Sequence, residues 1–527
     1  MSDAELELTD PQEIQRTLWD VIVIGSGIGG GTLALALASG GARVLVIERG
    51  GYVAAAAGSA EGVSPDERMR NGWWPQPISR HGGRDGSVER IFAPVGCAVG
   101  GSSVHYAAAL ERMEPSDFEP LTESPHPVER WPIGFQEFSR CYEAAESVYG
   151  LARAGQADAE ARLSPWDLRL MEAMRRNGLR PDILHVAMSY DAECRECVGR
   201  ICPRGCKMDA RTACVDKAAR DHGCRVLSGC EVLSLEADAK RVRTVRCSRE
   251  GRQLELQARV VALCAGAFHS PQILLRSWNA LWPSGLANRS DQVGRNLMFH
   301  TADIYALWAP RRIDRHGRQK KALSIRDFYV HEGRRLGYVQ SMGLEAGRGD
   351  IAAYLKNALR QRGLSNELVL KLVVKLPSMA AAALLGSAGI FAAMTEDDPD
   401  PGNRVVLDPA EPDGISFAYA ITDDLRRRAA ELRRQFARHI RPWRLVALST
   451  QLGMNYGHPT GTCRFGDDAA TSVLDRFCRA HEVENLYVVD SSFMPRSGAV
   501  NPSLTIAANA LRVAPKILEQ LRATGRA

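Results

Sequence analysis

Three features that would assign a chain to a particular class are missing from this sequence. There is no lysine- or arginine-rich tail, and the formal net charge of +5 over 527 residues is small, so the composition gives no support for nucleic-acid binding. The first seven residues are acidic and contain no apolar core, which is not the pattern of a signal peptide. The strongly apolar stretch Glu367–Met394 is interrupted by Lys371, Lys375 and Pro377, so we expect no transmembrane segment there.

That apolar stretch has two other interpretations. The simpler one is a buried or cleft-lining helical hairpin. The other is contact with a membrane surface, because basic residues flank the apolar run.

Cysteine is not scarce, but the signal that would accompany disulfides is absent. Thirteen cysteines are an odd number without a secretory leader, which favours a reducing compartment and predicts a cytoplasmic protein. Four of them, Cys194, Cys197, Cys202 and Cys206, fall within thirteen positions. Thiolates that close together can hold an iron–sulfur cluster or zinc. Their spacing matches no common ferredoxin or zinc-finger pattern, so free or disulfide-linked thiols are the alternative.

The most informative stretch is Asp20–Gly31, Asp-Val-Ile-Val-Ile-Gly-Ser-Gly-Ile-Gly-Gly-Gly. Its apolar, β-branched start predicts a buried parallel strand. Gly25, Gly27 and Gly30 then follow the G-x-G-x-x-G pattern, in which the first glycine permits a tight turn. The second permits close approach of a pyrophosphate, and the third permits close packing of the next helix. The sequence therefore predicts a dinucleotide site at the start of a helix over Thr32–Ala38.

A second predicted strand, Val44–Ile47, ends at Glu48. An acidic side chain there accepts hydrogen bonds from a ribose diol, which favours FAD or NAD over NADP. The motif alone does not separate FAD from NAD.

Further turns point at the same cofactor. Gly100-Gly101-Ser102-Ser103 exposes backbone and is suited to lie against a flat ring or a phosphate. Strands are predicted at Arg225–Leu235, which contains Val232, and at Ala258–Cys264, which leads through Ala265 into a helix. Trp73 and Trp74 either line a ligand cleft or pack beneath a loop, and packing is the preferred interpretation.

The chain is long enough for two domains, and its character changes over residues 301–450, where β-like runs alternate with helical ones. After that region, His458 heads a glycine-bearing loop, and Asn485–Asp490 reads as another buried strand. Asn501 and Pro502 are good residues for the cap and first turn of a final helix.

In this order the pieces resemble the glucose–methanol–choline (GMC) family of flavin oxidoreductases. The matching motifs are Gly25–Gly30 with Glu48, Gly100–Ser103, Ala265–Ala267 with Ser270-Pro271, Val293–Leu297, His458–Thr462, Leu486–Asp490 and Asn501-Pro502. The resemblance implies FAD in the opening site and an α/β fold, an α+β composite with a Rossmann-like FAD-binding domain. That domain would comprise residues 15–300 and 455–527, with the cysteine-rich insert near 190–210. Residues 301–454 would form a substrate-binding domain on an antiparallel sheet with helices.

The same resemblance places His458 and Asn501 beside the flavin. A neutral histidine is the natural acceptor for the proton of an alcohol near pH 7, while hydride passes to flavin N5. Asn501 would orient the hydroxyl or the developing alkoxide. The predicted cofactor-binding residues are Gly25, Gly27, Gly30, Glu48, Gly100, Gly101, Ser102, Ser103, His105, Val232, Ala265, Asp490 and Pro502.

A narrower resemblance concerns Ser103-Val-His-Tyr106 and the cysteine-rich segment. The first is similar to a segment of pyranose oxidases whose histidine binds flavin covalently, which makes His105 a candidate attachment point. It is also similar to a segment of FAD-dependent glucose and fructose dehydrogenases, in which the flavin is not attached in this way. Cys202-Pro-Arg-Gly-Cys-Lys207 resembles a turn in FAD-dependent sugar dehydrogenases, where such a segment can hold an iron–sulfur cluster.

These relatives imply a sugar, polyol or glycoside alcohol as substrate, and either oxygen or an electron-transfer partner as acceptor. One alternative is a dehydrogenase subunit that passes electrons through an iron–sulfur cluster to a cytochrome or quinone partner. The other is a redox-silent lyase on the same fold. A homo-oligomer is compatible with the sequence, which names neither the substrate nor the acceptor.

Overall fold

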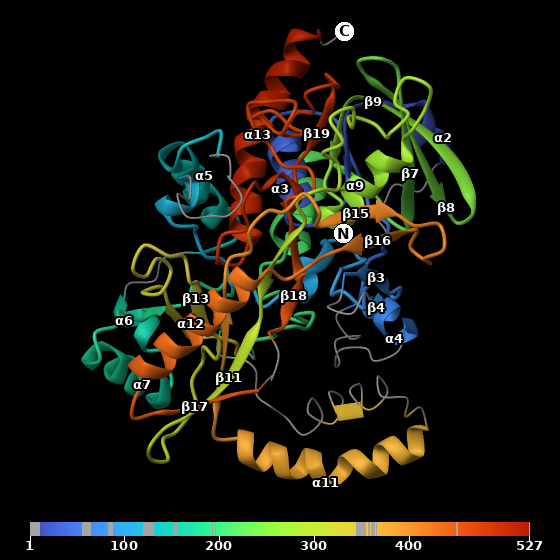
Figure 1. The fold of residues 1–527 in the computed structure, drawn as a ribbon. Coiled ribbons are helices and arrows are strands. Elements are labelled where there is room, and N and C mark those ends of the chain that lie inside the picture. Colours follow the sequence, from blue (N-terminus) through green and yellow to red (C-terminus); the bar gives the residue numbers. More distant parts are fainter. Residues whose placement is uncertain are drawn as a thin grey trace.

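The computed structural model describes residues 11–54, 65–82, 88–119, 131–151, 156–191, 193–194, 196–343, 366–448 and 452–525, and a few positions between 343 and 366. Helix α13 stands at one end of the molecule and helix α11 lies at the other, with the sheets between them (Figure 1).

A mostly parallel sheet forms the first layer. Its strand order is β6-β2-β1-β9-β8-β7, and β19, which lies off this path, pairs in parallel with the C-terminal part of β9. The strands are β1 (Leu18–Ile24), β2 (Val44–Ile47), β6 (Arg225–Leu227), β7 (Cys230–Ala237), β8 (Val242–Arg249), β9 (Arg252–Leu263) and β19 (Leu486–Val488). Strands β6, β2, β1 and β9 run parallel to one another. Strands β8 and β7 extend the sheet beyond β9 as an antiparallel meander.

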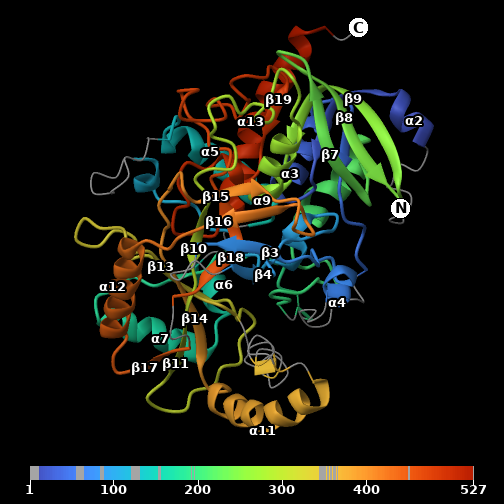
Figure 2. The same ribbon diagram turned by 45° about the vertical axis from the view of Figure 1, so that its right-hand side comes forward.

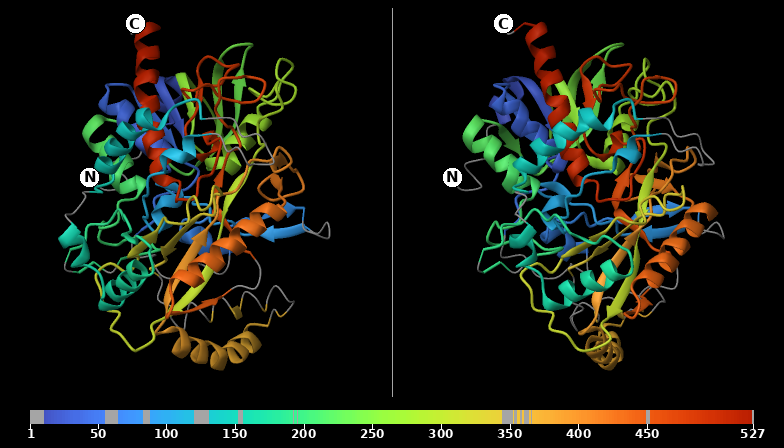
Figure 3. Two further views of the ribbon diagram at one scale, coloured as in Figure 1. Left: turned by 60° about the vertical axis from the view of Figure 1, so that its left-hand side comes forward. Right: turned by 90° about the vertical axis from the view of Figure 1, so that its left-hand side faces the viewer.

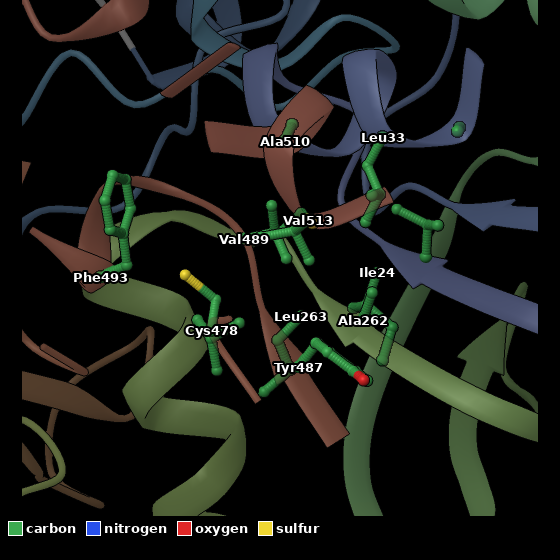
Figure 4. Close-up of a cluster of buried hydrophobic side chains, with 14 of the residues drawn as sticks. Ile24, Leu33, Ala262, Leu263, Cys478, Tyr487, Val489, Phe493, Ala510 and Val513 are labelled. Atoms are coloured by element: carbon green, nitrogen blue, oxygen red, sulfur yellow. The ribbon is translucent and has the colours of Figure 1, made fainter. Parts of the chain in front are cut away.

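Two helices close one face of that sheet. Helix α3 (Ile28–Ser39) follows β1, and α13 (Ser503–Ala523), from the far end of the chain, packs directly against it. Figure 4 shows side chains from these helices meeting those of β1, β9 and β19 in the buried core. The remaining helices near this sheet are α2 (Pro11–Arg16), α5 (Phe135–Val148), α8 (Asp216–His222) and α9 (Gly266–Arg276).

A second, antiparallel sheet has the order β17-β11-β14-β13-β12-β5. Its strands are β5 (Asp182–Ile183), β11 (Asp303–Trp308), β12 (Leu323–Ile325), β13 (Tyr338–Ser341), β14 (Gly389–Met394) and β17 (Arg444–Ala447). Helix α12 (Asp423–His439) and helix α7 (Pro165–Arg176) bury their apolar faces in the core of this sheet. A short helix, α6 (Gln156–Glu160), precedes α7.

Smaller sheets lie between the two large ones (Figure 2). One has the order β15-β16-β3-β4, built from β3 (Ile78–His81), β4 (Val88–Ile91), β15 (Arg404–Leu407) and β16 (Ile415–Ala418). The other pairs β10 (Met298–Thr301) with β18 (Met454–Thr460). Helix α4 (Pro65–Arg70) lies near the first of these.

Most expected elements are present, with one split. The predicted strand Arg225–Leu235 is two strands, β6 and β7, separated at Gly229, whose φ of +62° turns the chain. The final helix begins at Ser503 with Pro502 as its N-cap, one residue later than expected from Asn501.

The prediction of a buried hairpin for Glu367–Met394 was wrong. Residues Glu367–Leu385 form one helix, α11, and Gly389–Met394 form strand β14. Among the described residues, Leu368–Leu385 is the single helix window long and apolar enough to cross a membrane, yet only 18% of it is buried. Figure 3 shows α11 projecting at the end of the molecule opposite the C-terminus of α13.

Two segments within 15–300 pack away from the parallel sheet. Residues of α7 belong to the core of the antiparallel sheet, and β5 forms its edge. Strand β3 pairs with β16, which comes from the predicted substrate domain. The domain bounds 15–300, 301–454 and 455–527 therefore remain a prediction. Segments from 15–300 also contribute to the sheets formed by residues 301–454.

Candidate active site

One cavity gathers the predicted residues from both ends of the chain. Its volume is about 570 Å³, and it runs from the turn after β1 to the walls supplied by β11, β13 and β14. Thirteen of the fifteen predicted catalytic and cofactor-binding residues line it: Gly25, Gly27, Glu48, Gly101, Ser102, Ser103, His105, Val232, Ala265, His458, Asp490, Asn501 and Pro502. A hollow of about 620 Å³ beside α13, among Asp467, Arg476 and Lys516, contains none of them.

The two predicted residues outside the lining, Gly30 and Gly100, shape it from behind. A Cβ on Gly30 would lie 1.9 Å from the carbonyl oxygen of Gly25, so this glycine lets α3 pack against the turn. Gly25 has a φ of +100°, and a Cβ there would lie 2.4 Å from the carbonyl oxygen of Cys264. Gly27 differs, since its Cβ would meet only Gly101 Cα at 3.9 Å, which leaves room for a ligand.

Glu48 is buried and already holds the glycine turn together. One carboxylate oxygen accepts from Ser26 N at 3.0 Å and Ser26 Oγ at 2.6 Å, and the other accepts from Gly50 N at 3.0 Å. Burial raises the pKa of Glu48 above its ordinary value, against these hydrogen bonds. Since each carboxylate oxygen has two acceptor positions, the side chain retains capacity for a ribose hydroxyl.

The second glycine turn is braced by its serines. Gly100 N donates to Ser26 Oγ at 2.9 Å, which ties this turn to the first one. Ser103 Oγ donates to Gly100 O at 2.6 Å and accepts from Ala210 N at 2.9 Å. Ser102 Oγ accepts from Gly96 N at 2.8 Å.

Asp490, just after β19, also holds neighbouring turns together by accepting hydrogen bonds. Its carboxylate accepts from Gly266 N at 2.9 Å and Ser492 N at 2.8 Å, and from the hydroxyl of Ser270. It therefore connects β19, the start of α9 and the loop that leads to Asn501. Burial raises the pKa of Asp490.

His105 is held against Trp73. The two rings stack with centroids 4.2 Å apart and planes 17° apart, and both line the cavity. Trp73 is thus a cavity residue, contrary to the preferred sequence interpretation. His105 Nε2 is buried and has no hydrogen-bond partner in the described part of the chain. Burial lowers the pKa of His105 to about 4, so the ring is neutral at pH 7.

His458 lines the cavity and is paired with a histidine that the sequence did not single out. His300, fully buried on β10, places its Nδ1 2.9 Å from His458 Nδ1. The other nitrogen of His300 lies 2.9 Å from Gly498 O and 3.2 Å from Ser497 O. Carbonyl oxygens only accept hydrogen bonds, so His300 Nε2 carries the proton.

The contact with His300 selects one tautomer of His458, and the Asn455 amide competes for the same ring nitrogen. Burial lowers the pKa of His300, so its ring is neutral and its Nδ1 is an acceptor. His458 must then donate from Nδ1, which leaves its Nε2 without a proton. Asn455 Nδ2 also lies 3.1 Å from His458 Nδ1 and cannot bond to it in this tautomer. Burial, with His300 and Lys321 nearby, lowers the pKa of His458 well below its ordinary value.

Asn501 completes the polar lining just before α13. Its Oδ1 is buried and has no hydrogen-bond partner among the described residues. Such an oxygen is costly unless a ligand or water bonds to it.

The lining fits FAD. The N-terminus of α3 has no side-chain cap, so its first N–H groups remain for a pyrophosphate. Open space at Gly27 and the unpartnered Nε2 of His105 lie along the same cavity. Gly25, Gly27 and Glu48 would hold the adenosine and pyrophosphate half, while His105, His458 and Asn501 would lie at the ring.

The cysteine-rich segment is the predicted candidate for an iron–sulfur cluster. No group of three or more His, Cys, Asp or Glu side chains is arranged to hold a metal ion in the part of the chain that the structure describes. All thirteen cysteines are free thiols. The iron–sulfur cluster therefore has no support.

A buried lysine organises that segment instead. Lys207 Nζ donates to the carbonyl oxygens of Val104 at 2.9 Å, Tyr106 at 3.2 Å and Cys197 at 3.4 Å, and to that of Arg200. Burial lowers the pKa of Lys207 to about 8. The insert is thereby fastened to the backbone on either side of His105.

The glycine turns, the uncapped start of α3 and the polar lining are those of a dinucleotide-dependent oxidoreductase. Two family models, both described as GMC oxidoreductase, match residues 20–302 and 399–510. The chain belongs to the GMC oxidoreductase family, and it is an FAD-dependent enzyme that acts on CH–OH groups.

Curated relatives match nearly the whole chain. A 6'''-hydroxyparomomycin C oxidase of Streptomyces lividus and a paromamine 6'-oxidase of Streptomyces fradiae are each 29% identical over 96% of this chain and 92% of their own. The fructose dehydrogenase large subunit of Gluconobacter japonicus is 26% identical over 95% and 98%. Among solved structures, pyridoxine 4-oxidase from Mesorbium loti has a TM-score of 0.66 at 21% identity, covering 94% of this chain and 99% of its own.

Proposed function

We propose that this protein oxidises a hydroxyl group on a sugar, polyol or glycoside, with His458 as the base. The observation that carries the proposal is the His300–His458 pair, which leaves an unprotonated ring nitrogen on a residue that lines the cavity. The printed activities of the relatives, which include aminoglycoside oxidases and a fructose dehydrogenase, support this substrate class.

The chemistry follows from the protonation states. His458 Nε2 accepts the hydroxyl proton of the substrate, because a neutral imidazole is the available base near pH 7. When bound, FAD accepts the hydride. Asn501 orients the hydroxyl through its amide, whose Oδ1 has no partner among the described residues. His300 holds the Nδ1 proton of His458 and keeps its ring in one orientation.

Replacing the base tests the assignment. His458→Ala should retain FAD, because its neighbours in the glycine turns remain, while the rate of anaerobic flavin reduction by substrate falls about 10²–10⁴-fold. His316→Ala, at a 97% exposed side chain, is the matched control. Wild-type reduction rates in the His458 variant would exclude this role. An oxygen pulse after reduction then distinguishes an oxidase from a dehydrogenase that needs a protein or quinone acceptor.

We also propose that His105 Nε2 contacts the flavin ring. His105→Ala should lower flavin content per chain about tenfold or more, since a buried polar contact contributes on the order of 1–3 kcal/mol. Acid precipitation of the wild-type protein should leave yellow colour in the pellet if the contact is a covalent bond. Colour only in the supernatant would exclude attachment, and unchanged flavin content in the variant would exclude the contact.

A further inference from the structure

A buried lysine in the substrate half of the cavity has no partner. Lys321, just before β12, is 4% exposed and lines the cavity beside Gln340. No hydrogen bond or ion pair joins its Nζ to any residue that the structure describes. Lys207, which is equally buried, bonds to four carbonyl oxygens. The Lys321 ammonium therefore faces the cavity with its donors available to a ligand, and a charge-assisted hydrogen bond there is about twice as strong as a neutral one.

The nearby carboxylates are already engaged. Glu196 accepts from the backbone N–H of Lys321 at 3.1 Å and from Tyr190 OH at 2.7 Å. Glu111 pairs with Arg326 and accepts from His185 N at 2.9 Å. Neither carboxylate forms an ion pair with Lys321.

Lys321 also lies within electrostatic reach of the proposed base. Its charge is one of the influences on the pKa of His458. Gln340 lines the same cavity, and its Oε1 is buried and has no partner in the described chain. The cavity thus presents one unpaired cation and two unpaired amide oxygens, those of Gln340 and Asn501, to whatever binds beside the flavin.

We propose that Lys321 binds a carboxylate on the substrate, so that the preferred alcohols are hydroxy acids such as sugar acids. This inference rests on the proposed function, because it assigns the substrate class of the same site. The hydroxyl of the substrate would lie at His458, its carboxylate at Lys321, and a further hydroxyl would donate to Gln340 Oε1.

Acetate is a probe that does not need the right carbon skeleton. Titrated into the FAD-loaded enzyme and followed by flavin absorbance, acetate should bind saturably, and acetamide should bind at least about tenfold more weakly, since one charge-assisted hydrogen bond is worth on the order of 1.5–3 kcal/mol. Lys321→Met should remove that difference. Lys320→Met, at the exposed neighbour, should preserve it. Equal acetate binding in wild type and Lys321→Met would overturn the proposal.

Anaerobic bleaching by glucuronate, glucose and glucosamine separates this inference from the proposed function. Faster bleaching by the acid, lost in Lys321→Met, supports both. Bleaching by the neutral or amino sugar without preference for the acid overturns the carboxylate site and leaves alcohol oxidation standing. Acetate binding at Lys321 without bleaching by a wider set of alcohols would instead count against the proposed function alone.

The pH dependence of acetate binding is a further readout. Burial lowers the pKa of Lys321 to about 8, so the ammonium is charged below that pH and acetate affinity should fall as pH rises through it. The titratable groups around it are Glu196, Glu111 and His458. Glu111, with a pKa of about 2, stays ionised throughout, and His458 stays neutral.

A second inference rests on α11 alone. Leu370, Val374 and Ser378 form a buried stripe along this helix. On the other side Leu368, Leu372 and Leu376 are each 73% exposed. Four more apolar side chains are exposed on the same helix: Val369, Val373, Met379 and Leu384. The helix is therefore apolar on both faces, which a surface helix facing only water is not.

The charges beside this face are basic. Lys371 and Lys375 are exposed on one flank, and Leu368–Leu385 contains no acidic residue. At the C-terminal end of the helix, Trp308 Nε1 donates to Leu384 O at 3.2 Å and Arg315 Nη1 donates to Gly386 O at 3.3 Å. The segment 309–318 adds three further arginines against one aspartate. We infer that α11 lies on an anionic lipid bilayer, with its lysines among the headgroups.

Vesicle flotation of the FAD-loaded protein tests this surface. Binding to phosphatidylglycerol/phosphatidylcholine vesicles should exceed binding to phosphatidylcholine alone. Lys371→Gln and Lys375→Gln should each weaken it about fivefold, from about 1 kcal/mol per basic residue. Leu372→Gln with Leu376→Gln should abolish it. Trp278→Gln with Leu281→Gln, exposed apolar residues distant in sequence, should bind as wild type.

Two results would overturn the lipid proposal. Absent binding, or binding unchanged in the α11 variants, excludes the bilayer as its occupant. A wild-type dimer that the Leu372/Leu376 variant converts to monomer, with no vesicle binding by either, shows instead that a second copy of the chain covers α11. Size-exclusion chromatography of both proteins supplies that measurement.

Discussion

At the scale of single residues, the site depends on a proton whose position is fixed by backbone carbonyls. Gly498 O and Ser497 O require a proton on His300 Nε2, and His300 in turn requires one on His458 Nδ1. A base with the wrong tautomer would present N–H, rather than a lone pair, to an alcohol. His300 is therefore a positioning residue for His458.

Two substitutions at His300 separate positioning from packing. His300→Leu removes the acceptor, and we expect flavin reduction to slow about 10–100-fold. The lost hydrogen bond is one to a group that becomes charged, the His458 ring, and such a bond is worth on the order of 1.5–3 kcal/mol. His300→Asn restores an acceptor oxygen and should recover much of that rate. Stopped-flow reduction with saturating FAD measures both, and equal rates in the two variants would contradict the tautomer argument.

The pH profile gives an independent readout of the same pair. His458 is active when neutral, and its pKa is well below 6.5, so reduction should be independent of pH near neutrality with its acid limb below that value. Once protonated at acid pH, His300 carries a positive charge that is one of the causes of the lowered pKa of His458. His300→Leu should therefore move the acid limb to higher pH, a shift that a purely structural loss would not produce.

Residues in local motifs could be predicted from the sequence, and residues that act across the fold could not. Gly25, Glu48 and His458 belong to recognisable sequence motifs, and each of them lines the cavity. His300, on β10, contacts His458 from outside the cavity lining and lies three residues after the Val293–Leu297 motif. Lys321 lines the cavity in a segment with no motif. Their importance comes from a missing or shared hydrogen-bond partner, which only three-dimensional proximity reveals.

At the scale of elements, the glycine turn into α3 makes two different demands on its glycines. Gly30→Ala should prevent stable folding, because its Cβ would lie 1.9 Å from Gly25 O. Gly27→Ala should fold normally, since its Cβ meets nothing closer than 3.9 Å and its φ is −64°, yet lose FAD affinity about tenfold or more by occupying the ligand's space. Circular dichroism and flavin titration test the pair. A soluble, flavin-loaded Gly30→Ala would contradict the packing argument.

Elements with one clear period were predictable, and the mixed ones were not. Helix α12, Asp423–His439, is such an element, because its apolar side chains recur at helical spacing. Glu367–Met394 is apolar throughout, so periodicity could not show that it changes from helix to strand near Gly386. Nor could composition show that the buried Lys207 bonds to the backbone of the cysteine-rich insert.

At the scale of the whole molecule, buried ion pairs join the loop before Asn501 to the antiparallel sheet. Arg496, 1% exposed, makes a bidentate pair with Glu396 at 2.8 and 3.0 Å, just after β14. Arg335 lies 3.6 Å from the same carboxylate and 2.7 Å from Asp117. Burial raises the pKa of Glu396, but the guanidinium groups of Arg496, Arg335 and Arg428 outweigh it and hold that pKa below its ordinary value.

Glu396→Gln would leave the buried Arg496 guanidinium without its carboxylate, while Arg335 keeps its ion pair with Asp117. We expect the free energy of unfolding to fall by about 3–5 kcal/mol, since an unpaired buried charge cannot be solvated. Urea unfolding of the FAD-saturated protein measures this, with Glu172→Gln as control because that carboxylate is half exposed in its pair with Arg169. A loss below about 0.5 kcal/mol, the range of ordinary surface substitutions, would show that water or rearrangement replaces the pair. In that case the position of Asn501 relative to His458 would have to depend on the strand pairing of β10 with β18 instead.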